Sequence, residues 1–147
     1  MDAVDEKILR ELSKEGRLSN AGLADRVGLS ASACLRRVQE LERRKVITGY
    51  RATLDRAALG TGFTAYVTVG LSDHSKPAQE AFERAVSRLA DVRECHNITG
   101  DREYLLRVET SDLESYKRFH TDHLGMIPGV AAITTMVVMG SPKDERA

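Results

Sequence analysis

The sequence has few cysteines, no long hydrophobic run and no net charge, and the first two of these features exclude whole classes of protein. Only Cys34 and Cys95 are present and no CxxC pair occurs, so neither a structural zinc site nor a disulfide framework is indicated. No apolar stretch approaches the ~18–20 residues needed to cross a bilayer, and the acidic first residues do not resemble a secretion signal. We therefore expect a cytoplasmic protein with no membrane partner.

Catalytic motifs are also missing. The chain contains no P-loop, no dinucleotide-binding glycine motif, and no nucleophile with a recognisable base. Its hydrophobic fraction of 41% and charged fraction of 30% are nevertheless typical of a folded globular protein. We expect a protein that is not an enzyme and needs no cofactor.

The zero net charge conceals an uneven distribution. Residues 1–60 carry twelve Lys or Arg against nine Asp or Glu, whereas residues 61–147 carry ten against thirteen. All four histidines, all three prolines and all three phenylalanines fall in the second part. Because 147 residues suffice for two small domains, we predict one domain over 1–60 and another over 61–147.

Three helices are predicted in the first part. Apolar residues recur every four positions over 2–15, which is typical of an amphipathic helix. A short helix follows over 20–27 and ends at Gly28, and Ser30 can cap a third helix over 31–45. A short helix, a glycine-containing turn and a second helix form the helix-turn-helix arrangement, which places its second helix in the major groove of DNA.

The third helix has two contrasting faces. At 100° per residue, Cys34, Val38 and Leu41 share the core side, while the opposite side carries polar and basic residues suited to base edges and phosphates. The residues expected to contact double-stranded DNA are Ser30, Ser32, Arg36, Arg37, Gln39, Arg43 and Arg44. Of these, Arg37 and Arg44 lie to one side of the polar face and, with Lys45, are better placed for phosphates. The alternative is an ordinary solvated face in which Glu40 and Glu42 pair with neighbouring arginines.

After the third helix, residues 46–55 are predicted to form a strand that leads into a linker. The second domain then alternates between strand and helix patterns, and Ser111 with Glu114 matches a capping box. The predicted strands cover 63–71, 92–99, 104–109 and 130–139, and the predicted helices cover about 75–89 and 111–123.

The order β-α-β-β-α-β is that of the ferredoxin-like fold, an antiparallel sheet with both helices on one face, so the whole chain is of the α+β class. The other face of so small a sheet needs a cover, and pairing with a second copy would supply it. Such a homodimer would present two recognition helices to a pseudo-palindromic operator.

Several segments, in this order, resemble the Lrp/AsnC family of leucine- and asparagine-responsive regulators. They read AVDEKIL, GRLSNAGLADRVGLS, ACLRRVQELERRKVITGYRATLD, ECHNITGDREYLLRV, IPGV and TMVVM, and together they extend over nearly the whole chain. The resemblance implies a DNA-binding transcription regulator with a winged-helix-like N-terminal domain. It also implies a C-terminal domain that forms dimers, assembles them into tetramers or octamers, and binds an amino acid between dimers.

By the same resemblance, the amino acid would lie beside the GDRE hairpin and the last strand. Free backbone N–H groups around a glycine turn suit a carboxylate, and an acidic side chain suits an ammonium group. The effector-binding residues carried over are Gly100, Asp101, Arg102, Glu103 and Thr135. Many relatives have an aromatic residue where Arg102 stands and an aspartate where Glu103 stands, and the alternative is a plain solvated hairpin tip.

Other functions remain open at this point. His120 and His123 are three residues apart on a predicted helix and could bind a metal together with His96, which would make the chain a metal-responsive regulator, although no ligand of convincing spacing completes the site. An effector-free architectural DNA-binding protein, and a metabolic enzyme or stand-alone amino-acid-binding module without DNA affinity, are further alternatives.

Overall fold

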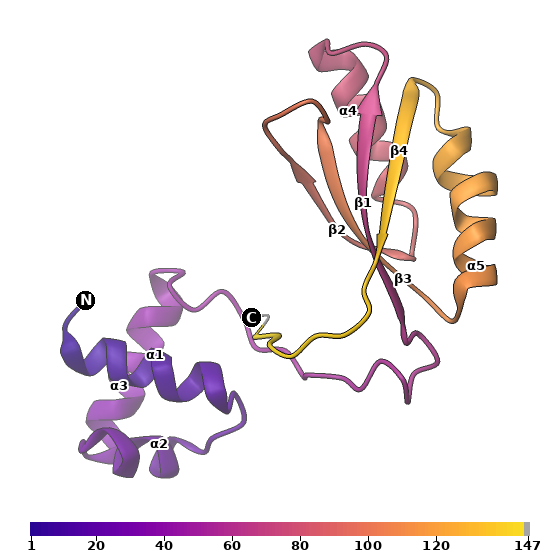
Figure 1. Ribbon diagram of the computed structural model, residues 1–147. Helices are drawn as coiled ribbons and strands as arrows, with labels where there is room; N and C mark the ends of the chain where they lie inside the picture. The colour runs from indigo at the N-terminus through magenta and orange to yellow at the C-terminus, as the bar shows by residue number, and fades with distance from the viewer. Residues whose placement is uncertain (146–147) are drawn as a thin grey trace. The chain divides into compact units, whose positions relative to one another are not determined.

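The computed structural model describes residues 1–145 (Figure 1). The chain divides into two compact units: Met1–Thr53 together with Glu145, and Leu54–Asp144. Each unit has its own cluster of buried hydrophobic residues. Among the described residues, no helix is long and apolar enough to cross a membrane.

The first unit contains the three predicted helices, α1 (Ala3–Lys14), α2 (Asn20–Val27) and α3 (Ala31–Arg43). Asp2 begins α1 by accepting hydrogen bonds from the backbone N–H groups of the first turn, where free donors and the helix dipole favour a carboxylate. The buried core of the unit consists of Ile8, Leu23, Ala24, Val27, Cys34 and Leu41.

The predicted strand over residues 46–55 is wrong. The chain turns back at Lys45, whose φ of 58° lies in the left-handed region, and the N–H groups of Val46 and Ile47 then donate to the Leu41 carbonyl at 2.9 and 3.2 Å. These donors are thus used to close the end of α3, and the following residues make no ladder with another strand. The first strand of the chain begins only at Phe63.

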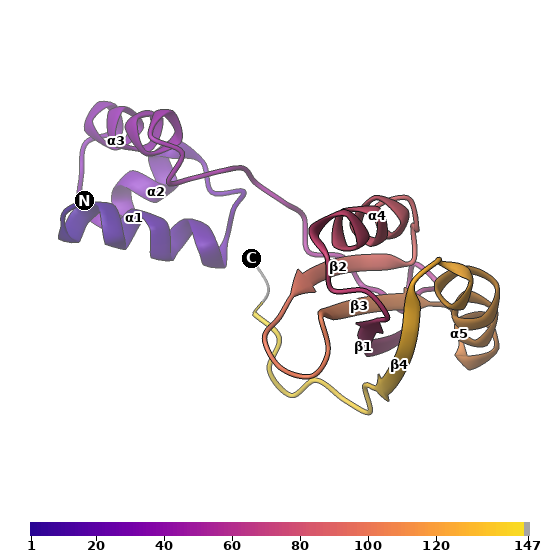
Figure 2. The same ribbon diagram turned by 90° about the horizontal axis from the view of Figure 1, so that it is seen from above.

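The second unit is a four-stranded antiparallel sheet with two helices on one face (Figure 2). Its strand order is β2-β3-β1-β4, as the ferredoxin-like prediction requires. The strands are β1 (Phe63–Leu71), β2 (Val92–Asn97), β3 (Tyr104–Thr110) and β4 (Val130–Val137), and the helices are α4 (Lys76–Val86) and α5 (Leu113–Arg118). A π-helical turn (Phe119–His123) and a 3₁₀ turn (Leu124–Met126) extend α5.

The predicted capping box of α5 is wrong by one residue. Asp112 is the N-cap, and its carboxylate accepts from the Ser115 N–H at 2.7 Å. Ser111 instead shares a hydrogen bond with the Ser115 hydroxyl at 2.7 Å, and Glu114 lies in the first turn. A carboxylate beside free N–H groups gains from the helix dipole, which explains why aspartate takes the cap position next to a serine.

Alternate residues of the sheet face the helices and form the larger core. Ala65, Val67 and Val69 of β1 are fully buried there against α4 and α5. The other buried members of this core are Leu71, Phe82, Val86, Tyr104, Leu106, Val108, Tyr116, Phe119 and Leu124. The sequence-predicted alternation of β1 is therefore confirmed.

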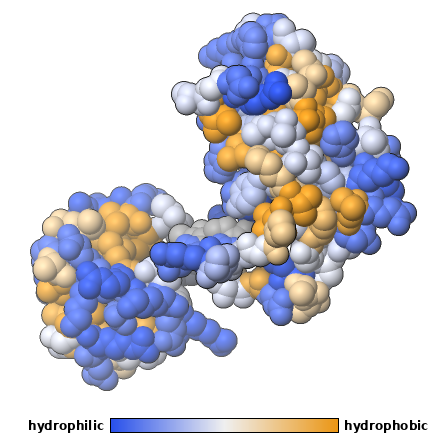
Figure 3. Space-filling model, in the orientation of Figure 1, coloured by the Kyte–Doolittle hydropathy of each residue, from blue (hydrophilic) through white to orange (hydrophobic). Residues whose placement is uncertain are grey.

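The opposite face, which we call the open sheet face, combines exposed apolar side chains with buried charges. Met136 lies opposite Tyr66 in the register and is 46% exposed. Beside them, Arg107 is buried, donating to the Glu94 carboxylate at 2.7 Å and pairing with the buried Glu109. On the side of this unit seen in Figure 3, hydrophobic residues are interspersed with hydrophilic ones.

Candidate functional site

The turn between α2 and α3 is held by hydrogen bonds at both ends. Gly28 ends α2 with a φ of 77°, a left-handed conformation that glycine adopts without strain. Ser30 caps α3 by accepting from the Ala33 N–H at 3.3 Å, and the Asn20 side chain donates to the Ala31 carbonyl at 2.8 Å. The two helices of the helix-turn-helix are therefore fixed to each other, and the Ser30 hydroxyl has a structural role in the cap.

The two faces of α3 are arranged as the sequence predicts. Cys34 and Leu41 are buried, with exposures of 0% and 1%, and point into the core. The residues of the opposite side are all exposed: Ser32, Arg36, Gln39 and Arg43. We call this set the outward stripe. None of its members is needed for the core, so all four are available to a partner.

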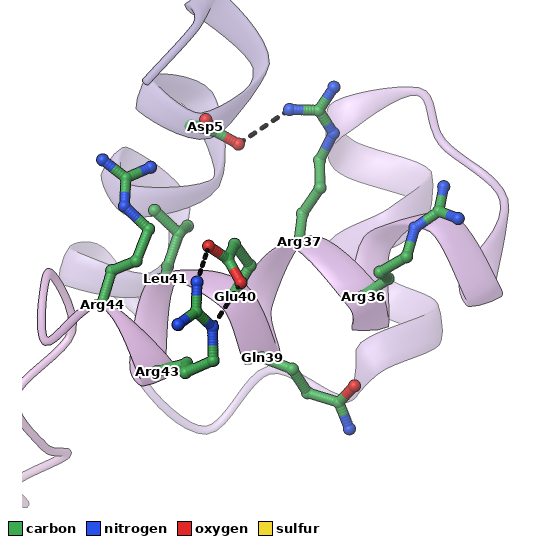
Figure 4. A pocket seen from close by; sticks show the side chains of 8 residues that line it. All are labelled: Asp5, Arg36, Arg37, Gln39, Glu40, Leu41, Arg43 and Arg44. Carbon is green, nitrogen blue, oxygen red and sulfur yellow. Dashed lines mark hydrogen bonds and ion pairs between the residues drawn. The ribbon is translucent and has the colours of Figure 1, made fainter.

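A shallow groove of about 560 Å³ runs along α3 (Figure 4). Its lining residues are Asp5, Arg36, Arg37, Gln39, Glu40, Leu41, Arg43 and Arg44. Four guanidinium groups thus face two carboxylates, which leaves the groove cationic. Within it, Arg43 pairs with Glu40 at 2.6 Å, but both side chains are largely exposed, so a phosphate or base can displace the carboxylate at little cost.

Two of the expected phosphate-binding residues differ in their surroundings. Arg44 is exposed at the end of α3. Arg37 is only 34% exposed and pairs with Asp2 and Asp5 at the beginning of α1, at 2.8 Å in each case. Arg44 is thus available for phosphate, while the Arg37 guanidinium already has anionic partners.

At the GDRE hairpin, the side chain of Glu103 is already engaged. Its carboxylate accepts from the Leu71 N–H at 2.8 Å and contacts the ring of His74. These two contacts, the backbone one foremost, hold the pKa of Glu103 below its ordinary value. The carboxylate is therefore ionised and ties the hairpin to the end of β1.

The other hairpin residues are more accessible. Gly100 has a φ of 122°, which only glycine adopts readily, and Asp101 beside it is exposed. Arg102 is half-buried, and a Cβ added to Gly70 would lie 3.3 Å from its side chain. Arg102 therefore lies directly over β1, and Gly70 leaves room for it.

Thr135 lies elsewhere in the same protomer. It pairs with Val67 in the register of β4, on the helix-facing side, and its hydroxyl shares a hydrogen bond with Tyr116. Four residues of strand separate Val67 from Leu71, where Glu103 binds, or about 13 Å at the usual rise. The structure does not bring Thr135 together with the hairpin tip in one chain.

The histidines are not gathered into a metal site. His96 contacts Glu94 on the open sheet face at 3.3 Å, whereas the ring of His120 packs beside Tyr116 and that of His123 beside Phe119. Within residues 1–145 no group of three or more His, Cys, Asp or Glu side chains could hold an ion.

The sequence-based predictions missed two side chains at these sites. Leu35 is 45% exposed and, at 100° per residue, lies ~60° from Ser32, beside the outward stripe. Its apolar character gives no signal of exposure in the sequence. His74 reaches Glu103 across 29 residues of chain, and nothing local could have indicated that contact.

Comparison with known proteins finds a related domain for each of the two units. The sequence profile of the Lrp/AsnC ligand binding domain matches residues 64–147, and that of a winged helix-turn-helix DNA-binding domain matches residues 1–48. The leucine-responsive regulatory proteins of Salmonella typhimurium and Escherichia coli are each 39% identical to the chain over 144 residues, which cover 98% of it and 88% of the relative.

Solved structures give the same result. A transcriptional regulator of Neisseria meningitidis, crystallised as a complex with L-Met, superposes with a TM-score of 0.94 at 33% identity, covering 98% of this chain and 93% of the other. An AsnC family transcriptional regulator of Agrobacterium tumefaciens gives 0.92 at 34% identity, with 98% and 94% covered. The chain belongs to the Lrp/AsnC family, and it is a DNA-binding transcription regulator of that type.

Proposed function

We propose that this regulator reads a pseudo-palindromic operator as a dimer and changes its DNA binding when an amino acid binds to its second domain. Residues 1–60 would bind the DNA, and residues 61–147 would bind the effector and join the copies. The observation that carries the proposal is the outward stripe of α3, which is exposed and polar along a helix whose other side is buried.

The chemistry of the outward stripe suits base edges. Arg36 and Arg43 can donate to both major-groove acceptors of guanine, Gln39 can pair with adenine, and Ser32 can donate or accept. The exposed Leu35 beside them would contact a thymine methyl group. Arg44 and Lys45, at the end of the helix, would neutralise phosphates.

The open sheet face supports the dimer. It exposes Met136 and leaves Tyr66 partly accessible, while the charges next to them are already paired within one chain. A second copy placed face to face would cover these apolar side chains without burying an unpaired ion. Two copies also supply the two reading helices that a two-fold symmetric site requires.

The effector site is proposed to form between dimers in a tetramer or octamer. Gly100, Asp101, Arg102 and Glu103 of one chain would act with Thr135 of another, because one protomer does not bring them together. The L-Met complex of the Neisseria meningitidis relative supports an amino acid as the ligand. An effector alters DNA binding only if it binds one assembly more tightly than another.

A thermal-shift screen against the twenty amino acids tests the effector. At least one should raise the melting temperature of the wild type, since a ligand that binds only the folded state stabilises it by mass action. The shift should disappear in Asp101→Ala, which loses the exposed carboxylate of the hairpin, and persist in Asp122→Ala, a control that removes another exposed carboxylate, on the α5 extension. No shift with any amino acid would favour an effector-free architectural regulator.

Gel shifts with the DNA upstream of the chain's own gene test the reading of an operator. A discrete complex should form on this fragment and resist an excess of a scrambled duplex of the same length. Equal competition by both duplexes would mean that the chain binds DNA without reading its sequence, and the role proposed for the outward stripe would be lost.

A further inference from the structure

Arg37 is held differently from the other three arginines of the groove. A single nitrogen, Nη1, donates to Asp2 Oδ1 at 3.0 Å, to Asp2 Oδ2 at 2.8 Å and to Asp5 Oδ1 at 2.8 Å. Its side chain is 34% exposed, whereas that of Arg43 is 73% exposed. In Figure 4 Arg37 extends toward Asp5, away from Gln39.

The two carboxylates are themselves fixed to the N-terminus of α1. Asp2 accepts from the N–H groups of Val4 and Asp5 at 3.0 and 2.9 Å, and the Asp2 N–H donates to the Asp5 carboxylate at 3.1 Å. The Asp5 N–H and then Arg37 hold the pKa of the Asp2 carboxyl below its ordinary value, and Arg37 and then the Asp2 N–H do the same for the pKa of Asp5. Arg37 therefore ties the middle of α3 to the hydrogen-bonded cap of α1.

We propose that Arg37 is a positioning residue: its ion pairs fix α3 against the beginning of α1 and thereby aim the outward stripe, so that Arg37 itself does not neutralise a phosphate. The proposal rests on the reading role proposed above for the outward stripe. It replaces the expectation that Arg37 contacts the DNA backbone.

Charge and geometry both favour this assignment. The Asp2 and Asp5 carboxylates already balance the charge of Arg37 and hold its Nη1, so the guanidinium attracts a phosphate less than an unpaired arginine does, and turning it to the DNA would leave two carboxylates without their cation. The apolar contacts between α1 and α3, such as those around Ile8 and Leu41, are not directional. The hydrogen bonds of Arg37 to the beginning of α1 add a directional contact between these two helices.

The test compares Arg37→Gln with the double variant Asp2→Asn/Asp5→Asn, because asparagine remains a good N-cap while losing the ion pair. Each variant is titrated with the upstream DNA and with a scrambled duplex of equal length, well below its melting temperature. Both should lose on the order of tenfold in preference for the upstream DNA, about as much as one good base contact supplies. The variant that combines all three substitutions should lose no more of this preference than Arg37→Gln or the double variant does alone.

A phosphate-binding Arg37 gives the opposite pattern and would overturn the proposal. Arg37→Gln would then weaken binding to both duplexes equally, and the slope of log affinity against log salt would fall by about 0.9. The Asp2→Asn/Asp5→Asn variant would keep its preference and bind both duplexes more tightly, since it frees the guanidinium. An unchanged salt slope with a reduced preference supports the positioning role.

Two exposed residues of α1 provide matched controls for charge alone. Arg10→Gln and Glu6→Gln change the net charge of the same unit without altering the Arg37 ion pairs. Their effects on DNA affinity are subtracted from those of Arg37→Gln and of Asp2→Asn/Asp5→Asn. Thermal melting establishes that each variant is folded. If Arg36→Ala leaves the preference unchanged, the outward stripe itself is misassigned, which is a different result from a failure of Arg37.

Discussion

Replacing Arg36 by alanine is expected to weaken sequence-specific DNA binding by about 1–3 kcal/mol, the usual value of one bidentate contact to a base. Arg36 is exposed on the outward stripe and has no ion-pair partner among residues 1–145, so its removal leaves the fold and its neighbours unchanged. Fluorescence anisotropy with the upstream DNA would measure the loss. Specificity should relax at one base pair in each half-site.

The matched control is Arg10→Ala, which removes the same charge from the outer side of α1. It should reduce affinity only slightly, and by the same factor for specific and scrambled DNA. If a folded Arg36→Ala protein bound the upstream DNA as tightly as the wild type does, the outward stripe of α3 would not be the surface that contacts the bases.

Replacing Met136 by aspartate should separate the proposed dimer into monomers. The residue is 46% exposed in a single chain, so the change costs little in folding. Within a face-to-face dimer, each copy would bury a carboxylate without a partner, a cost on the order of several kcal/mol. Sedimentation equilibrium should show the monomer, and operator affinity should fall because one reading helix is lost from each complex.

Met126→Asp is the control for this second prediction. Met126 is 71% exposed in the turn after α5, which lies outside the open sheet face. Its replacement should leave both the oligomeric state and DNA binding intact. Persistence of the dimer in Met136→Asp would rule out the open sheet face as the contact between copies.

The sequence predicted the helices, the order of strands and helices along the chain and the two faces of α3 because each depends on local periodicity. Val67 and Val69 alternate with polar residues in β1, and Gly28 and Ser30 mark the turn by their own conformational preferences. Such signals lie within a few residues of the structure that they specify, so one sequence is enough to detect them.

The incorrect or missing sequence predictions concern polar groups that can form hydrogen bonds with more than one partner. Val46 and Ile47 are β-branched residues, which are typical of strands, but their N–H groups donate to the Leu41 carbonyl and not to another strand. Ser111 and Asp112 can both cap a helix, and the free N–H groups and dipole of α5 favour the carboxylate of Asp112. The contact between Asp2 and Arg37 joins residues 35 positions apart, which no periodicity reveals.

The separate cores of the two units have a genetic consequence. A substitution that empties the core around Ile8 and Leu41 would unfold the first unit, while the sheet, built on its own buried residues, would still form the proposed dimer with normal subunits. Mixed dimers would then carry a single working DNA-binding unit. Alleles of this kind should therefore be dominant over the wild type, whereas alleles that destroy the sheet should be recessive.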